Sequence, residues 1–500
     1  MGDMFQLSVE LYDTKDKKVV WSDRWQEKWD NLPTIKINLS DGLLKALDTT
    51  SKVEKKAETT NTKAYELYLK AKHTYDKRTD TNDTETARKL LRQAIELDDT
   101  LITAKVQLGW TYSEMGDYDE AMEIYIPALE QAEKLDDKTG MGAALNSIGV
   151  VYWNKGEYDK ALEYYEKSIK IQEEIGDKRG MGLTLNNIGI VHSNRGEYDK
   201  ALEYYDKSLK IKEELGDKHG MGATLHNIGI VHYYKGNYDK TLEYYERSLK
   251  IDEEIGDTRG MGLTLGNIGN VHENRGEYDK ALEYYDRALK IQEEIGDTRG
   301  MGHTLGNIGV VYWNKGEYDK ALEYYDKSLK IKEELGDKHG MGATLGNMGI
   351  VHDNKGEYDK ALEYYDKSLK IAEELGDKAG MGFNLLTIGI VHYYRGEYNK
   401  AAEHFEKSLV IQKEIGVKDL ELHSTIYLNL SYKHLDKDYD KQDIHSLIKD
   451  AENVEYEVNF RLYQLLDDTS YLEIAYTQVQ DKASEMEEEL GKKLLSYPIP

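Results

Sequence analysis

The sequence predicts an all-α chain, a solenoid of about nine helix pairs with a small β-hairpin and helix segment before it and a helical cap after it. Three observations predict this fold. Glycines recur at a constant spacing of 40 residues. Within each copy, two blocks carry apolar residues at helical spacing, and both blocks are bounded by residues that start or stop helices. A constant period of this kind is typical of repeat architectures.

The amino-terminal segment differs from the repeats. From Phe5 to Trp25, apolar and polar residues alternate on both sides of residues 13–16, which predicts a β-hairpin, and a helical run follows to Leu47. Residues 1–48 resemble the last part of a TolB-like region, which in bacterial and archaeal signalling proteins precedes such repeats, sometimes after a class III cyclase or kinase domain. An isolated hairpin is marginal in water. The segment is therefore expected to pack on the first helices or to be the remnant of a larger domain, with residues 49–62 as a linker.

The glycine series marks the repeats: Gly116, Gly156, Gly196, Gly236, Gly276, Gly316, Gly356 and Gly396. In a representative copy, Gly196 and Gly216 supply the left-handed residues that end the two helices. Asp217 is a suitable N-cap for the next helix. Gly220 then lies in the opening turns, where glycine costs about 1 kcal/mol relative to alanine, so a frayed or bent helix start is expected.

Within each copy a set of inward positions can be assigned: Leu185, Ile188, Gly189, His192, Gly196, Tyr198, Ala201, Tyr205 and Ser208. Small residues at Gly189 and Ala201 allow the two helices to approach closely. These columns resemble the tetratricopeptide repeat (TPR) signature, which implies a right-handed superhelix. Seven 40-residue copies occupy 142–421, and two shorter ones occupy 63–135.

The period of 40 exceeds the common TPR period of about 34, and the junction IGDKRGMG at residues 175–182 resembles the long-repeat type found in Partner of Inscuteable proteins. That resemblance implies that about eight repeats complete a turn and hold an extended peptide in the groove. The chain departs from that family at Gly182 and Leu183, where the family carries arginine early in the first helix.

Beyond 421 the glycine spacing is lost, but apolar residues continue at helical spacing through Ile426, Leu428, Leu430 and Tyr432. A further helix is expected from Tyr471 to Leu495, with an acidic patch at 485–489. Residues 422–500 are interpreted as capping helices. The final residues, SYPIP, are more typical of an interrupted sequence than of a natural tail.

Composition narrows the function. The net charge of -27 repels nucleic-acid phosphates, so DNA and RNA are not expected partners. There is no cysteine, no secretory signal pattern and no apolar run of membrane length, so we expect a cytoplasmic protein that does not enter membranes.

No catalytic or cofactor motif is present, so neither an enzyme nor a cofactor is expected. One column of the repeats carries histidines: His192, His232, His272, His352 and His392. Each is at least one full repeat from the next, so neighbouring histidines are too far apart to bind the same metal ion. Tyr152 and Tyr312 occupy the same column, which favours a packing role. The recurring carboxylate pairs, such as Glu213 and Glu214, are interpreted as a solvated outer face.

Differences between the copies locate the expected groove. With Gly189 counted as position 8, positions 2, 5 and 12 vary, and position 12 reads Trp153, Ser193, Tyr233, Glu273, Trp313, Asp353 and Tyr393. Selection for a ligand and drift at exposed sites both produce such variation. Position 6 carries an asparagine column: Asn187, Asn227, Asn267, Asn307 and Asn347. Because an amide both donates and accepts hydrogen bonds, these residues could hold the backbone of an extended peptide.

The position 13 asparagines, such as Asn194, are interpreted as helix ends. The groove residues expected to bind a partner are the position 6 asparagines with Trp153, Tyr233, Trp313 and Tyr393. VYWNKG recurs 160 residues apart, at 151–156 and 311–316. The resemblance to the long-repeat type implies about eight repeats per turn, which would place the two tryptophans on opposite groove walls. The leading hypothesis is a scaffold that binds a protein or peptide. The alternative is a regulatory arm of a signalling enzyme whose catalytic domain lies outside this chain.

Overall fold

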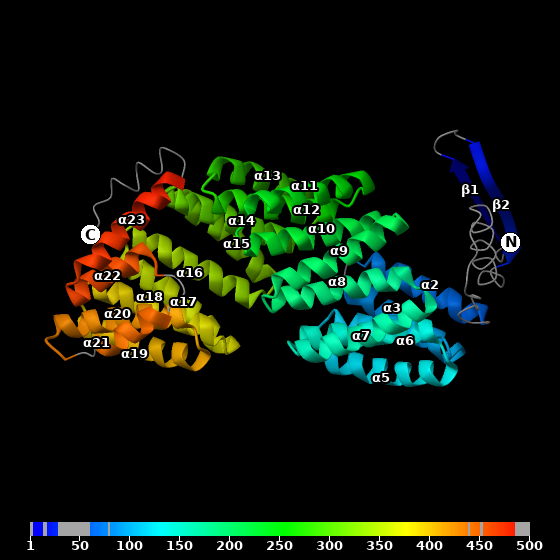
Figure 1. Ribbon diagram of the computed structural model, residues 1–500, viewed down its shortest axis with the longest axis horizontal. Coiled ribbons are helices and arrows are strands. Elements are labelled where there is room, and N and C mark those ends of the chain that lie inside the picture. Colours follow the sequence, from blue (N-terminus) through cyan, green and yellow to red (C-terminus); the bar gives the residue numbers. More distant parts are fainter. Residues whose placement is uncertain are drawn as a thin grey trace. The chain divides into compact units, whose positions relative to one another are not determined.

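The computed structural model describes residues 4–13, 18–28, 61–78, 81–438, 441–450 and 454–485, the first two ranges by their backbone alone (Figure 1). The contacts divide the chain into two compact units, Met1–Asn237 and Tyr238–Pro500, and each is described by itself. The helical run expected to Leu47, most of the linker and the acidic patch at 485–489, apart from Glu485 itself, lie outside these residues.

The alternating segment forms two strands, β1 (Met4–Asp13) and β2 (Lys18–Lys28). They pair antiparallel, with Gln6 opposite Gln26, and the register shifts between Leu11 and Tyr12. The strands flank residues 14–17, one residue beyond the predicted turn at 13–16, because Asp13 belongs to β1.

Helices make up most of the described residues from 61 onward. In the first unit they are α2 (Thr62–Asp76), α3 (Thr81–Leu97), α4 (Ile102–Ser113), α5 (Tyr118–Leu135), α6 (Lys138–Asn154), α7 (Tyr158–Ile175), α8 (Lys178–Asn194), α9 (Tyr198–Leu215) and α10 (Lys218–Tyr234). In the second unit they are α11 (Tyr238–Ile255), α12 (Thr258–Asn274), α13 (Tyr278–Ile295), α14 (Thr298–Asn314), α15 (Tyr318–Glu334), α16 (Lys338–Asn354), α17 (Tyr358–Leu375), α18 (Lys378–Tyr394), α19 (Tyr398–Ile415), α20 (Lys418–His434), α21 (Lys441–Asp450), α22 (Tyr456–Leu466) and α23 (Thr469–Glu485).

These elements confirm an all-helical repeat region. The two shorter pairs are α2 with α3 and α4 with α5, and helices α6–α19 span 138–415. The long-repeat helices therefore begin a few residues before 142 and end before 421, because Asp137 caps α6 and Gly416 ends α19 in a left-handed conformation. Helices α20–α23 follow as the carboxyl-terminal group.

The turns between helices follow the predicted chemistry, with one correction. Gly196 and Gly216 have φ of +73° and +65°, and the Asp217 side chain accepts a hydrogen bond from the Gly220 amide at 3.0 Å. The expected fraying at Gly220 is wrong, since α10 is regular from Lys218. A Cβ at Gly220 would collide with the carboxylate of Asp217. Glycine is therefore needed here to make room for the N-cap.

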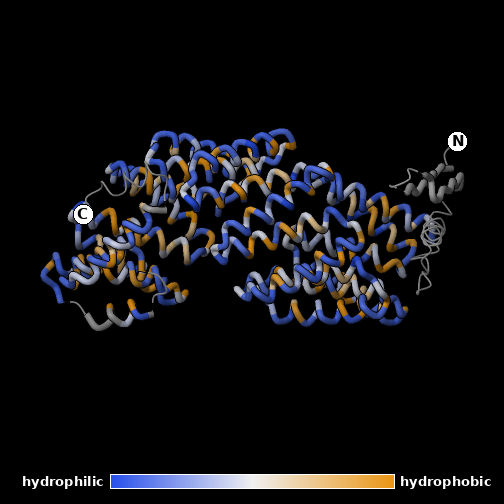
Figure 2. Tube along the Cα trace, turned by 45° about the horizontal axis from the view of Figure 1, so that its top comes forward, coloured by the Kyte–Doolittle hydropathy of each residue, from blue (hydrophilic) through white to orange (hydrophobic). Residues whose placement is uncertain are grey.

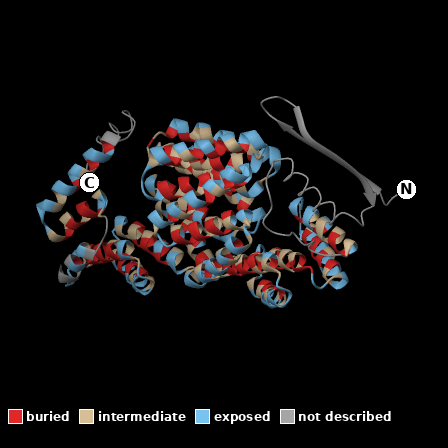
Figure 3. Ribbon diagram, turned by 45° about the vertical axis from the view of Figure 1, so that its right-hand side comes forward, coloured by how far each residue is buried: buried red, intermediate tan, exposed pale blue. Residues whose placement is uncertain are grey.

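Each pair packs around a contact between a glycine and a ring. A Cβ on Gly189 would lie 2.6 Å from Cε1 of Tyr205, and the Tyr205 side chain is only 2% exposed. The buried hydroxyl of Ser208 donates to the carbonyl of Gly182 at 2.7 Å, which joins the middle of α9 to the first turns of α8. Figure 3 shows buried residues on the helix faces that meet neighbours and exposed ones on the remaining faces.

Successive pairs within each unit are joined by recurring ion pairs on the surface. Lys155 contacts Asp119, Arg195 contacts Asp159, Lys315 contacts Asp279, Lys355 contacts Asp319 and Arg395 contacts Asp359, at 2.6–2.8 Å. The aspartates are highly exposed, so each pair adds little to stability. The apolar contacts between helices therefore provide most of the stability.

Apolar residues are interspersed with polar ones along every helix, as Figure 2 shows. No helix in the described ranges combines the length and the hydrophobicity needed to cross a bilayer.

Candidate binding surface

Within each unit, the first helix of each pair lies next to the first helices of the neighbouring pairs. First helices of successive pairs, such as α6 with α8 and α12 with α14, contact one another more closely than the second helices do. Positions 2, 5, 6, 9, 12 and 13 lie three or four residues apart and so share one side of the first helix. We call this surface the inner face. At position 2 it exposes apolar side chains: Leu183 is 51% exposed and Leu263 is 58% exposed.

The position 6 asparagines lie on this face, half-buried, and several bond to other asparagines. Asn187 donates to Oδ1 of Asn146 at 3.2 Å, and Asn227 donates to Oδ1 of Asn186 at 3.4 Å. The acceptors Asn146 and Asn186 stand at position 5 of the preceding repeat. Each such bond uses one of the two N–H groups of the position 6 amide. These asparagines therefore form hydrogen bonds between repeats, which we call amide rungs. The sequence alone did not suggest this role.

The second unit has a different polar arrangement. Asn307 donates to Oδ1 of Asn270 at 3.0 Å, and the same oxygen accepts from the Tyr285 hydroxyl at 2.6 Å. Asn270 also donates to Oδ1 of Asn267 at 3.4 Å. Asn270 occupies position 9, where the other long copies carry valine or isoleucine. That substitution is the sequence signal for this network. Asn347 lies at position 6 of α16 and is likewise half-buried.

The position 13 asparagines end their helices, as expected. Asn154 and Asn274 are the last residues of α6 and α12, and their amides donate to the carbonyls of Val150 and Asn270 four residues back, at 2.9 and 2.8 Å.

The two position 12 tryptophans are half-buried. Trp153 packs against the cluster that contains Ile188 and Val191 of α8, and Trp313 packs against Met348 and Val351 of α16. Within the described residues neither indole N–H has a hydrogen-bond partner. Part of each ring thus stabilises contacts between repeats. The two residues belong to different units, so their predicted placement on opposite walls stays a prediction.

Tyr233 and Tyr393 have different surroundings. Tyr233 is half-buried and meets Tyr234 edge to face, while Tyr234 is 64% exposed. Tyr393 instead packs into the carboxyl-terminal core. Its ring meets Tyr427 and His434 of α20, and its hydroxyl lies 3.2 Å from Nε2 of His434.

Arg461 of α22 extends the same cluster. It donates to the hydroxyls of Tyr394 and Tyr427. The expected groove residue Tyr393 is therefore shared with, and partly covered by, the helices that follow the repeats.

Two half-buried carboxylates occupy position 12 in the second unit. Glu273 accepts a hydrogen bond from Asn314 of α14 at 3.2 Å, and burial raises the pKa of its carboxyl. Burial also raises the pKa of Asp353, to about 6. Within the described residues neither carboxylate forms an ion pair.

Two lysines are buried, and within the described residues neither forms an ion pair. Lys212 is 3% exposed and donates to the Thr224 hydroxyl at 2.7 Å, and burial lowers its pKa to about 8. Lys332 is 7% exposed and donates to Thr344 at 2.8 Å. The other copies carry Gln172, Asp252, Gln292, Ala372 and Gln412 in the same column. The change between glutamine, lysine and aspartate in one column is the sequence signal for these residues.

The histidine column has the predicted packing role. His192 and His272 stack on Tyr204 and Tyr284 with ring centroids 5.3 and 5.2 Å apart. His192 Nδ1 lies 2.9 Å from the Glu197 carboxylate, at the start of the second helix. In the described part of the chain no group of histidines and carboxylates is arranged to hold a metal ion.

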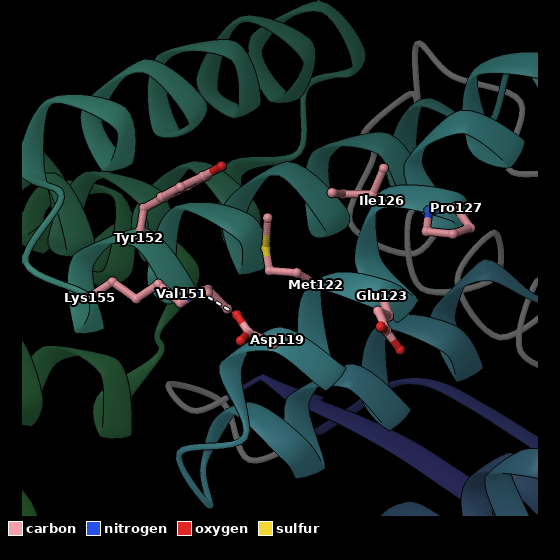
Figure 4. A pocket seen from close by; sticks show the side chains of 8 residues that line it. All are labelled: Asp119, Met122, Glu123, Ile126, Pro127, Val151, Tyr152 and Lys155. Atoms are coloured by element: carbon pink, nitrogen blue, oxygen red, sulfur yellow. Dashed lines mark hydrogen bonds and ion pairs between the residues drawn. The ribbon is translucent and has the colours of Figure 1, made fainter.

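One cavity of about 530 Å³ lies away from the inner face, between α5 and α6 (Figure 4). Met122, Ile126 and Pro127 supply its apolar lining, and the ion pair of Lys155 with Asp119 closes one side. In the next copy the residues equivalent to Ile126 and Pro127 are Glu166 and Lys167. The cavity is thus a local feature of the shorter repeat.

Comparison with known families identifies the repeat. The family model described as tetratricopeptide repeat matches residues 99–174, 180–254, 260–334, 300–374 and 340–414, more than half of the chain. The chain belongs to the tetratricopeptide repeat family. No curated protein sequence matches this TPR protein.

Solved structures share its fold. One is a Signal Transduction ATPase with Numerous Domains that carries a tetratricopeptide repeat sensor, from Pyrococcus horikoshii. It has 17% identity and a TM-score of 0.54, over 75% of this chain and 56% of that one. Another is the apo form of the quorum sensor NprR from B. thuringiensis, with 16% identity and a TM-score of 0.51, over 70% of this chain and 99% of that one. At these identities the likeness concerns the fold.

Proposed function

We propose that this TPR protein is an interaction scaffold that binds an extended segment of a partner protein along the inner face of its first helices. The observation that carries the proposal is the half-buried amides at position 6 of successive first helices within each unit. Exposed apolar side chains at position 2 accompany them, such as Leu183 in the first unit and Leu263 in the second. Apolar side chains left exposed beside ordered polar groups are typical of protein interaction sites.

The amide rungs are suited to hold a peptide backbone. In Asn187 and Asn227 the bond between repeats occupies one N–H group, so the chemistry of the amide provides a second N–H and a carbonyl oxygen for a ligand. The rungs also fix the amide orientation before the ligand arrives, which lowers the entropy lost on binding. We assign the same function to Asn307 and Asn347, and to Asn267, whose Oδ1 already accepts a hydrogen bond from the Asn270 amide.

The aromatic residues at position 12 are assigned to selectivity. Trp153, Tyr233 and Trp313 are half-buried and rigidly packed, and rigid aromatic side chains often dominate binding energy. Tyr393 contributes less in this proposal, because the carboxyl-terminal helices already contact its ring. The 40-residue period, shared with Partner of Inscuteable proteins, also supports an extended ligand.

Calorimetric titration of a peptide selected from a random dodecapeptide library tests the proposal. Replacing Asn227, Asn267 and Asn307 with alanine should cost about 0.5 to 1.5 kcal/mol per site, largely independent of peptide sequence. Circular dichroism checks that the helices survive. Glu213→Ala, on the exposed side of α9, is the control. If Glu213→Ala weakens binding and the triple variant does not, the ligand binds another face.

A second function, a regulatory arm for a catalytic domain, is supported by one comparison. The P. horikoshii protein combines a TPR sensor with an ATPase in one chain, and residues 1–48 resemble a TolB-like region of signalling proteins. The genomic sequence upstream of the Met1 codon decides this point. A cyclase, kinase or ATPase reading frame continuous with Met1 favours the regulatory arm, and its absence favours the independent scaffold.

A further inference from the structure

Two carboxylates on the inner face of the second unit form no ion pair with any described residue. Glu273 of α12 and Asp353 of α16 both stand at position 12 and are half-buried, and within the described residues neither forms an ion pair. The highly exposed aspartates between repeats, such as Asp279 and Asp319, each contact a lysine. These exposed aspartates of the second unit are thus paired with lysines, whereas the two half-buried carboxylates at position 12 form no ion pair within the described residues.

Such an arrangement destabilises the free protein. A half-buried carboxylate loses hydration, and only a hydrogen bond or a cation compensates for that loss. Glu273 has one hydrogen bond, from Asn314, and in the described residues no side chain donates to Asp353. A bound cation would supply the missing compensation at both places.

An aromatic ring lies between the two acids along the inner face. Trp313 occupies the same position 12 on α14, the first helix between α12 and α16. Asn314, the next residue, reaches the Glu273 carboxylate, and Trp313 packs against Met348 and Val351 on the helix that carries Asp353. The three side chains therefore form a row across three neighbouring first helices.

We propose that Glu273, Trp313 and Asp353 form a recognition row for a basic segment of the partner, which places arginine or lysine side chains against the two carboxylates. This inference rests on the proposed function and specifies the ligand chemistry. Guanidinium groups pair with carboxylates and also stack on tryptophan, so arginine fits the row best. The net charge of -27 attracts a basic segment over longer range.

The distance between the two carboxylates predicts how far apart the basic residues of the ligand should be. Packed helices lie about 8 to 10 Å apart. Because α14 lies between the helices that carry Glu273 and Asp353, the two acids are separated by roughly twice that distance, 16 to 20 Å. An extended chain advances about 3.3 Å per residue. The partner should therefore carry two basic residues about five or six positions apart.

Selection from a phage-displayed random dodecapeptide library on the full chain tests this inference, followed by calorimetry of the best peptide. We expect selected peptides enriched in arginine and lysine. Replacing Glu273 with Gln and Asp353 with Asn together should weaken the best peptide by about tenfold or more. The control double variant, Glu283→Gln with Asp326→Asn, removes the same two charges from exposed positions on the second helices α13 and α15. It should change affinity by less than about twofold.

The outcomes show whether the recognition row fails alone or whether the proposed scaffold function fails with it. Peptides without basic enrichment, or equal losses in the two double variants, would overturn the recognition row and leave the scaffold intact. If the library yields no binding peptide, the scaffold proposal itself fails, and the row fails with it.

Discussion

A contact between a glycine and a ring recurs in almost every pair and sets how closely the two helices approach. At Gly269, a Cβ would lie 2.6 Å from Cε1 of Tyr285, while at Gly266, three residues earlier on α12, no atom lies within 4 Å of the Cβ position. The same helix thus contains one glycine required by packing and one that packing does not require.

Gly269→Ala should lower the free energy of unfolding by about 1 to 3 kcal/mol, because the added methyl displaces the Tyr285 ring. Gly266→Ala should be neutral or stabilising by up to about 1 kcal/mol, because alanine favours helix and fills open space. Chemical denaturation of both variants measures the difference. Equal effects would show that the ring contact does not limit helix approach.

Asp353 should make stability depend on pH. Its pKa is raised from 3.8 to about 6, so the folded chain binds this proton more tightly than the unfolded chain, and stability falls as pH rises through that window. At about pH 7.5, Asp353→Asn should raise the free energy of unfolding by about 1 to 2 kcal/mol, allowing for partial solvation.

Thermal melts across that pH range measure the effect of Asp353→Asn. Below about pH 3 the gain should vanish, since the Asp353 carboxyl is then protonated in both the folded and the unfolded state. Asp326→Asn, at an exposed position, serves as the control. A stability gain that persists unchanged at low pH would contradict the explanation.

The role of an individual residue could be predicted where the equivalent residues of the other copies indicate it. The packing role of the histidines followed from tyrosines in the same column, and the Asp217 cap followed from its place after Gly216. The bond from Asn187 to Asn146 did not follow, because it joins position 6 to position 5 of the preceding repeat and needs the spacing between helices. The reason for glycine at position 220 was also missed. Helix propensity gives only the cost of a glycine in a helix, and does not show that a side chain here would collide with the Asp217 carboxylate.

At the scale of the element, two or three residues separate each first helix of a long repeat from the preceding helix, and an aspartate cap makes so short a turn possible. On α14, Asp297 accepts a hydrogen bond from the Gly300 amide at 3.0 Å. The cap satisfies one of the amide groups that every helix start leaves unpaired.

Asp297→Ala should therefore cost about 1 kcal/mol of stability, whereas Asp297→Asn, which keeps the acceptor, should cost little. The melting midpoints of the two variants, compared with that of the unmodified chain, provide the measurement. If asparagine is as damaging as alanine, the side-chain oxygen is not what holds this turn together.

Helix existence and order were predictable because the apolar period and the glycines repeat in every copy. The contacts of the carboxyl-terminal helices were not, because they depend on residues far apart in sequence. Tyr393 belongs by pattern to the inner face, yet Tyr427 and His434 pack against it and Arg461 binds its neighbour Tyr394. No local pattern connects residue 393 with residue 461.

At the scale of the whole molecule, stacked repeats stabilise one another through nearest-neighbour contacts. Ala281 is fully buried and shares a cluster with Tyr285 of its own helix and with Ile308 and Val311 of α14. A change at this residue therefore acts on more than one pair.

Ala281→Trp should lower the melting midpoint of the whole second unit, since the indole cannot fit without separating α12, α13 and α14. Ala343→Trp is the matched control, because Ala343 is exposed at position 2 of α16. An unchanged midpoint for Ala281→Trp would mean that the repeats are not coupled through this cluster.

The central claim is that the first helices form the binding surface, and hydrogen–deuterium exchange with and without a library-selected peptide tests it most directly. Bound peptide should slow exchange in first helices such as α8, α12, α14 and α16, most strongly around positions 6 to 12. Exchange on the exposed sides of α9, α13 and α15 should remain unchanged. Protection confined to the second helices, with none in the first, would contradict the claim.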